Sequence, residues 1–225
     1  MKKSLKRRDF LSRSALAALA TASLGACTGR ETTSKNASKE SSLSAGPVED
    51  RFSEELEKNR QMPRDLVLRL LDQQVDKYMQ LSHHCAQSSF MALMEQFGLK
   101  GEQVVKALTP MPGIAERGET CGAVTGPLMA MGLIYGRNIH QMDDWDKYQE
   151  SLIPTGRFCE SFEKEYGTTL CSQVQEGKFG RCFRLTDPEE LQDFQNAGAT
   201  EKCSEVVRTA VHMAAEIILD DLTLS

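Results

Sequence analysis

The segment CGAVTGPLMAMGLIY, residues 121–135, contains no charged residue and is apolar on almost every side of a helix. A helix that is hydrophobic all round is expected in the interior of a protein, where other elements cover each of its faces. Gly122, Gly126 and Ala130 are spaced four residues apart, so they share a face that another helix or a cofactor can approach closely. Pro127 should bend this helix or leave one carbonyl unpaired. The segment therefore predicts a small-residue central helix.

The rest of the chain also follows helical spacing, and the alternation typical of strands is essentially absent. Asp187 followed by Pro188 is a strong helix start, because Asp can cap the helix and Pro suits its first position. Pro154 is expected to separate two helices, since a proline inside a helix removes a hydrogen bond. We therefore expect an all-α fold, a compact multi-helix domain around residues 121–135. The other stretches with apolar residues at helical intervals are 66–79, 85–97, 102–108, 145–153, 158–166 and 201–222.

Four cysteines stand where helices are expected to begin: Cys85, Cys121, Cys171 and Cys203. Three of them have a hydroxyl residue three positions earlier, at Ser82, Thr168 and Thr200. At that spacing a hydroxyl residue would act as the N-cap and accept a hydrogen bond from a backbone amide of the first turn. A helix N-terminus carries roughly half a positive charge, which favours a thiolate over a thiol. Four such termini brought together would form a redox or metal site.

The N-terminus has the features of an export signal. Basic residues are followed by the short apolar stretch 14–26, which is too short to span a membrane and reads as a signal peptide. The paired Arg7 and Arg8 precede Asp-Phe-Leu, as in twin-arginine signals, and predict transport of the folded protein by the Tat export machinery. An ordinary secretory signal is the alternative. Leu24-Gly25-Ala26-Cys27 is similar to a lipobox, so Cys27 is expected to carry a lipid anchor, with simple cleavage nearby as the alternative.

The composition divides the chain into a signal peptide (1–26), a Ser/Thr-rich flexible linker (27–52) and a helical domain (53–225). Loss of residues 1–26 removes six of 27 basic and one of 32 acidic residues, which leaves 21 against 31 and a net charge of −10. This charge argues against nucleic acid as a partner and against docking on anionic lipid. We expect a periplasmic or cell-surface protein that meets the membrane only through its lipid anchor.

The cysteines and their neighbours resemble the C_GCAxxG_C_C family of redox-active proteins over residues 65–220. The resemblance rests on four separated blocks in the same order, and it implies a small helical domain with four functional cysteines, Cys85, Cys121, Cys171 and Cys203. The chain departs from the family pattern in its extra Cys159 and Cys182, and in Pro127. The extra pair could form a structural disulfide or remain two buried thiols. The matching blocks begin at Cys85-Ala86-Gln87-Ser88, Glu119-Thr120-Cys121-Gly122-Ala123, Phe162-Glu163 and Cys203-Ser204-Glu205.

The first hypothesis for the four cysteines is a metal centre that exchanges electrons with a partner protein. Four cysteines are the usual ligand set of iron–sulfur clusters, and the small residues Gly122, Ala123 and Gly126 would let backbone amides approach the cofactor. Export of a folded protein would allow cluster insertion in the cytoplasm. Zinc suits the same four thiolates but carries no electrons. The chain has no C-x-x-C pair, so the spacing is less diagnostic than a compact motif.

The second hypothesis is a thiol–disulfide oxidoreductase, in which a thiolate at a helix N-terminus attacks a disulfide and another cysteine resolves the product. Cys85 and Cys121 are the candidates, because their local motifs are the strongest. The third is a purely structural domain with two disulfides or a zinc ion. His84 precedes Cys85 and could ligate a metal or tune the thiol. No C-x-x-C-H motif is present, so covalently attached c-type haem is not expected.

Overall fold

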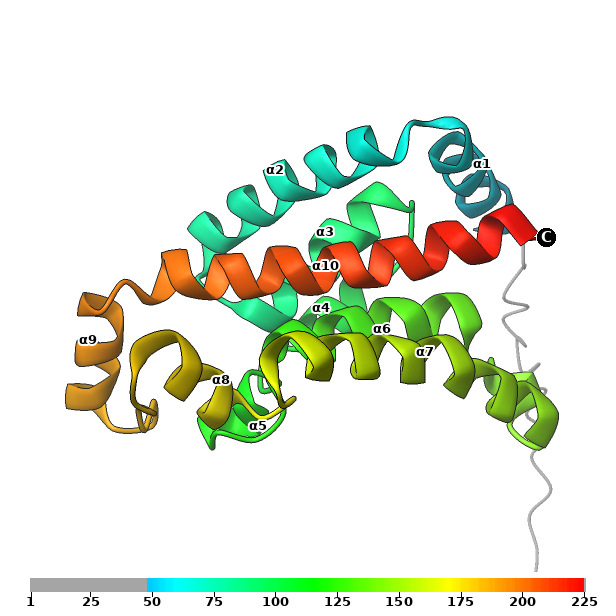
Figure 1. Ribbon diagram of the computed structural model, residues 1–225. Coiled ribbons are helices and arrows are strands. Elements are labelled where there is room, and N and C mark those ends of the chain that lie inside the picture. Colours follow the sequence, from blue (N-terminus) through cyan, green and yellow to red (C-terminus); the bar gives the residue numbers. More distant parts are fainter. Residues whose placement is uncertain (1–47, 225) are drawn as a thin grey trace, which may run out of the picture. The chain divides into compact units, whose positions relative to one another are not determined.

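The computed structural model describes residues 48–224, and every regular element in this range is a helix (Figure 1). The all-α expectation is therefore confirmed. The predictions for Arg7, Arg8 and Cys27 lie outside the described residues. Within 48–224, no helix combines the length and the apolar composition that a membrane span requires. The elements in chain order are α1 (Val48–Gln61), α2 (Arg64–Ser82), α3 (Cys85–Gln96), α4 (Glu102–Ala107), α5 (Gly113–Glu116), α6 (Gly122–Tyr135), the 3-10 helix η2 (Ile139–Gln141), α7 (Trp145–Tyr166), α8 (Cys171–Phe179), α9 (Pro188–Asn196) and α10 (Ala199–Leu224).

The centre of the fold is shared by α6 and α10. The N-terminal half of α6 is buried from Gly122 to Pro127, as the apolar segment predicted. Its C-terminal half lies nearer the surface, where Met129 and Leu133 keep 42% and 44% of their area exposed. The last helix, α10, packs against α1, α2, α3, α6, α7 and α9. In Figure 1 it runs between α2 and the pair α6 and α7. The small-residue helix is thus one of two central helices.

Two glycines let α3 and α6 pack in close contact. A Cβ atom at Gly122 would overlap Sγ of Cys85 and lie 2.8 Å from the backbone nitrogen of Ala86. At Gly126, an added Cβ would overlap the hydroxyl of Ser89 and lie 3.1 Å from the backbone nitrogen of Phe90. Both values are shorter than ordinary van der Waals contact. The expected small-residue face of α6 therefore seats α3, and it brings the start of α6 against the first residue of α3.

The core contains apolar side chains from most of the helices, and a buried polar link joins α1 to α3. Phe90, Phe158 and Phe162 are fully buried in it. Between α1 and α3, Asn59 Nδ2 donates to the carbonyl of Gln96 (2.8 Å), and Gln96 Nε2 donates to Asn59 Oδ1 (2.6 Å). Oε1 of Gln96 accepts a further hydrogen bond from Nε2 of Gln74 (3.3 Å), so both buried side-chain amides are paired and tie α1 to the domain.

Two sequence-based boundaries differ from the structure. Pro154 does not separate two helices, because α7 continues through it from Trp145 to Tyr166. The proline forgoes only one backbone hydrogen bond, whereas a continuous helix holds Phe158 and Phe162 in the core. The first helix, α1, begins at Val48 inside the expected linker 27–52. Proline followed by acidic residues favours a helix start at this position.

Candidate functional site

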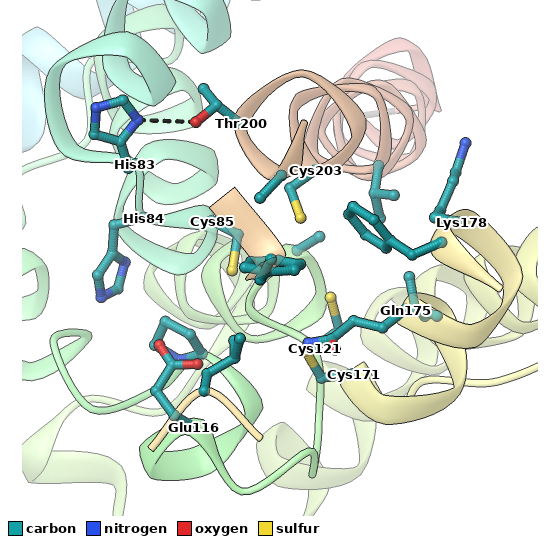
Figure 2. A pocket seen from close by; sticks show the side chains of 18 of the residues that line it. His83, His84, Cys85, Glu116, Cys121, Cys171, Gln175, Lys178, Thr200 and Cys203 are labelled. Carbon is teal, nitrogen blue, oxygen red and sulfur yellow. Dashed lines mark hydrogen bonds between the residues drawn. The ribbon is translucent and has the colours of Figure 1, made fainter. Parts of the chain in front are cut away.

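The four cysteines that were expected at helix starts line one pocket. Its volume is about 430 Å³, and Cys85, Cys121, Cys171 and Cys203 all contribute to its wall. Figure 2 shows their side chains around the same space, although they come from four segments of the chain. Cys121 is buried, whereas the other three are half-buried. The tertiary structure therefore brings together the set of cysteines that the sequence selected.

Three of these cysteines occupy helix starts, as expected. Cys85 and Cys171 are the first residues of α3 and α8, and Cys121 is the N-cap residue of α6. The fourth expectation is wrong by about one turn. Because α10 already begins at Ala199, Cys203 lies beyond its first turn. The positive ends of three helices, and not four, are therefore adjacent to the thiols.

The predicted hydroxyl N-caps are wrong at all three positions. Ser82 is the last residue of α2 and donates to the carbonyl of Tyr78 (2.9 Å). Thr168 accepts a hydrogen bond from the amide of Leu170 (3.0 Å), which lies before α8. Thr200 lies within α10, where its hydroxyl is 3.0 Å from Nδ1 of His83. The spacing is regular, but each hydroxyl bonds a partner other than an amide of the first turn that follows the cysteine.

A short backbone ladder holds Cys121 and Cys171 side by side. The amide of Cys121 donates to the carbonyl of Thr169 (2.8 Å), and the amide of Cys171 donates to the carbonyl of Glu119 (2.7 Å). Thr120 and Leu170 form an isolated antiparallel β-bridge between these bonds. Cys121 and Cys171 are the residues that directly follow the two members of this bridge, and each donates its backbone amide across it. The two cysteines are consequently fixed relative to each other by main-chain hydrogen bonds.

The thiol of Cys121 donates a hydrogen bond to Cys171, and this contact divides their acidities. It lowers the pKa of Cys171, and a second donor, Nε2 of Gln175, lies 3.5 Å from the same sulfur. The pKa of Cys121 is raised, first because its proton is used in this hydrogen bond and then because the thiol is buried. Cys171 is thus the member of the pair that holds negative charge more readily.

Burial raises the pKa of the other two thiols. The pKa of Cys85 is raised well above its ordinary value, first by burial and then by the nearby sulfurs of Cys203 and Cys171. Burial raises the pKa of Cys203 to about 12. Both side chains line the pocket, and the protein around them excludes most of the solvent that would stabilise a thiolate. Without a compensating cation, both are expected to stay protonated at neutral pH.

A strained turn places Glu116 beside the thiols. All four residues of α5 have positive φ, and three of them, Ile114, Ala115 and Glu116, are not glycine. A left-handed conformation costs such residues roughly 1–2 kcal/mol each. Backbone bonds hold it, since the amide of Ala115 donates to Pro110 (2.6 Å) and that of Glu116 to Pro112 (2.9 Å). Glu116 lines the pocket, and burial raises the pKa of its carboxyl.

His84 serves as a cap within the structure. Its Nδ1 accepts a hydrogen bond from the amide of Gln87 (3.1 Å), and its Nε2 lies 3.0 Å from the carbonyl of Thr109. Nε2 must therefore carry the proton, and both ring nitrogens are engaged. A ligand role for His84 would require one of these bonds to break. In Figure 2 its ring lies to one side of the four thiols.

The small residues expected to approach a cofactor lie in two environments. Ala123 lines the pocket, and Gly122 contacts Cys85, whereas Gly126 contacts α3. Their cofactor role stays a prediction. Within residues 48–224, no three His, Cys, Asp or Glu side chains are already arranged as a metal site.

The two extra cysteines lie outside the pocket wall. Cys159, on α7, packs against the core, and Cys182 follows α8. The six cysteines at positions 48–224 are all free. In the described part of the chain, Cys159 and Cys182 therefore do not form the structural disulfide that was one of the two alternatives.

Sequence reasoning missed several polar residues of the pocket, among them Gln175 and Glu116. Gln175 follows Cys171 by four positions, so helical spacing alone places the two side chains on one face. Because α8 runs from Cys171 to Phe179, this spacing is the signal that identifies Gln175. For Glu116 no local signal exists, because a left-handed turn of mostly ordinary residues is stabilised by its surroundings and not by its own preferences.

Comparison with known proteins agrees with this geometry. The model of the family described as "Putative redox-active protein (C_GCAxxG_C_C)" matches residues 83–217. No curated protein and no solved structure matches the chain. The match covers more than half of the chain and includes all four pocket cysteines. The protein therefore belongs to the C_GCAxxG_C_C family of redox-active proteins.

Proposed function

We propose that this protein is an exported electron-transfer protein whose four pocket cysteines hold an iron–sulfur cluster. One observation carries the proposal: four free thiols from four separate segments line a single pocket. Four cysteine thiolates are the ligand set of two-iron and four-iron clusters. Cys85, Cys121, Cys171 and Cys203 would hold the cluster, which would supply one-electron transfer when bound.

The electrostatics of the pocket support a cationic occupant. Burial raises the pKa of Cys85 and Cys203, so neighbouring thiolates at these positions are unfavourable without positive charge. Among the described residues that line the pocket, Lys178 is the one Lys or Arg side chain, and it pairs with Glu205 at 3.0 Å. The helix starts at Cys85, Cys121 and Cys171 add partial positive charge. Iron ions would supply the remainder.

A single zinc ion would satisfy the same thiolates but would transfer no electrons. Membership of a redox-active family therefore favours iron–sulfur over zinc. The paired Arg7 and Arg8 support export by the Tat machinery in the folded state, after the cluster has been inserted. The protein would then act at the periplasmic or cell-surface side of the membrane, anchored through Cys27, and exchange electrons with a partner protein.

A second candidate function is dithiol–disulfide exchange at Cys121 and Cys171. The hydrogen bond between their sulfurs and the lowered pKa of Cys171 favour it. Oxidation would join the two sulfurs and release two electrons and two protons to a disulfide substrate, which would be reduced to two thiols. The reactive pair differs from the Cys85 and Cys121 expected from sequence, because Cys171 is the thiol that holds negative charge more readily.

Anaerobic purification of the full chain distinguishes these candidates. The cluster proposal predicts a coloured protein with iron and sulfide in stoichiometric amounts. Serine substitution at any of the four pocket cysteines should reduce the iron content, whereas Cys159→Ser and Cys182→Ser should retain it. A colourless protein in which Cys121 and Cys171 form a disulfide reversibly against glutathione would support the second candidate. Thiols that neither bind iron nor titrate would contradict both.

A further inference from the structure

Gln175 lies one turn after Cys171 in α8, and its side chain is almost fully buried, with 4% of its area exposed. Its Nε2 donates to Sγ of Cys171 across 3.5 Å. Its Oε1 accepts a hydrogen bond from the backbone amide of Phe183 (2.8 Å). Both ends of the side-chain amide are therefore used, one by the sulfur and one by the loop that follows α8.

The bond from Phe183 fixes the orientation of the Gln175 amide. A backbone N–H can only donate, so the atom that it contacts must be the side-chain oxygen. The NH₂ group consequently faces Cys171. Aromatic packing holds the loop, because the ring of Phe183 lies 5.7 Å from that of Phe179 and 5.3 Å from that of Phe194. If the side-chain amide of Gln175 turned over, its NH₂ group would face the backbone N–H of Phe183. Two donors would then oppose each other in a buried site, which is unfavourable.

We propose that Gln175 is a positioning residue of the redox centre, whose fixed N–H donor stabilises negative charge on the sulfur of Cys171. A hydrogen bond to a charged acceptor is stronger than one between neutral groups. Hydrogen bonds to ligand sulfurs are among the factors that set the potential of an iron–sulfur cluster. The inference therefore deepens the proposed function and rests on it for the effect on potential. The effect on the thiol itself requires only the geometry of Gln175 and Cys171.

The variant Gln175→Glu tests this role with little change in shape. It keeps an oxygen to accept the amide of Phe183, but it replaces the N–H donor by an oxygen facing the sulfur. In the full chain with iron bound, we expect the midpoint potential to shift to more negative values, because the oxidised, more positive centre is favoured. The matched control is Gln173→Glu, which adds the same charge to an exposed position of the same helix.

A second measurement does not depend on iron. In reduced, iron-free protein at a fixed pH, we expect Gln175→Glu to slow the alkylation of Cys171 by iodoacetamide about tenfold, as the loss of a charge-assisted hydrogen bond implies. Peptide mass spectrometry identifies the modified cysteine. Gln173→Glu should react like the unmodified protein. Gln175→Leu provides a second test if the glutamate variant does not fold, because it removes the donor without adding charge.

The outcomes separate this inference from the proposed function. If iron is bound but Gln175→Glu changes neither the potential nor the alkylation of Cys171, the role of Gln175 is wrong and the cluster stands. If no iron is bound but alkylation slows as expected, the cluster proposal fails and the role of Gln175 stands. If Gln173→Glu slowed the alkylation of Cys171 equally, the effect would arise from the added negative charge alone, and the inference would be overturned.

Discussion

At the scale of a single residue, Glu116 shows that burial in the pocket disfavours the charged form of an acidic side chain. Its carboxyl lies on the left-handed turn α5, lines the pocket and has a pKa that burial raises. A carboxyl group whose pKa is raised in the folded state binds its proton more tightly there than in the unfolded state. Its ionisation therefore lowers the stability of the fold as the pH rises through that pKa.

We predict that Glu116→Gln stabilises the iron-free domain at pH 7–8. The gain over the unmodified chain should shrink as the pH falls and be lost below about pH 4.5, because both states then hold the proton. Denaturant unfolding at several pH values measures the difference. Glu119→Gln, at an exposed position of the same segment, should show no such rise with pH. A gain from Glu116→Gln that is equal at pH 4 and pH 8 would contradict burial as the cause.

The cysteines show what local sequence can and cannot determine about single residues. The four cysteines selected from the six of the described domain lie around one pocket, and their functional role stays a prediction. Their individual acidities could not be predicted, because each depends on neighbours distant in the chain, such as Cys121 for Cys171. The N-cap hydroxyls failed for a related reason. Side chains such as Thr200 found partners that only the packing of α2 against α10 supplies.

At the scale of elements, the interface between α3 and α6 positions the pocket. Gly122 and Gly126 allow the two helices to approach until the start of α6 touches Cys85 and Ser89. Helical spacing predicted this small-residue face. The spacing could not show whether a helix or a cofactor lies against this face, because either can approach closely where a Cβ is absent.

We predict that Gly126→Ala destabilises the domain by roughly 1–3 kcal/mol, because the new methyl group must displace the backbone of α3. Gly132→Ala is the matched control on the same helix, where an added Cβ meets nothing within 4 Å. That control should stabilise by roughly 0.5–1 kcal/mol, since alanine favours the helix. Thermal unfolding of both variants measures the contrast. Similar effects at the two positions would show that the close contact is unimportant.

Helix α7 marks the limit of local signals at this scale. Pro154 and the apolar pattern on either side of it predict two helices, yet one continuous helix forms. The free energy from burying Phe158 and Phe162 against the core exceeds the cost of one lost backbone bond, of about 3 kcal/mol. By contrast, Asp187 caps α9 as expected, and Asp144 caps α7, because a cap is satisfied within a few residues of the chain.

At the scale of the whole molecule, the four cysteines join parts of the chain from Cys85 in α3 to Cys203 in α10. A group that binds all four would tie these elements together only in the folded state. Ligands that bind the native state alone add their binding free energy to its stability.

We therefore predict that chelation of iron lowers the melting temperature of the protein by several degrees or more, as expected for a loss of a few kcal/mol in a domain of this size. Differential scanning calorimetry under anaerobic conditions measures the change. Chelation should lower the melting temperature of Cys159→Ser by the same amount, because this side chain lies outside the pocket wall. Chelation should lower the melting temperature of Cys203→Ser by less. A melting temperature that does not respond to chelation would contradict a cluster bound by the folded domain.

The sequence by itself determined the helical class, most helix boundaries, the small-residue face of α6 and the membership of the four cysteines in one set. These properties depend on periodicity, capping and motif order, which act over short stretches of chain. Only the tertiary structure decided which thiols are paired, that Gln175 faces Cys171, that Glu116 enters the pocket and that α7 continues through Pro154. Each of these depends on burial and on contacts between distant segments, whose free energies exceed the local preferences of the residues involved.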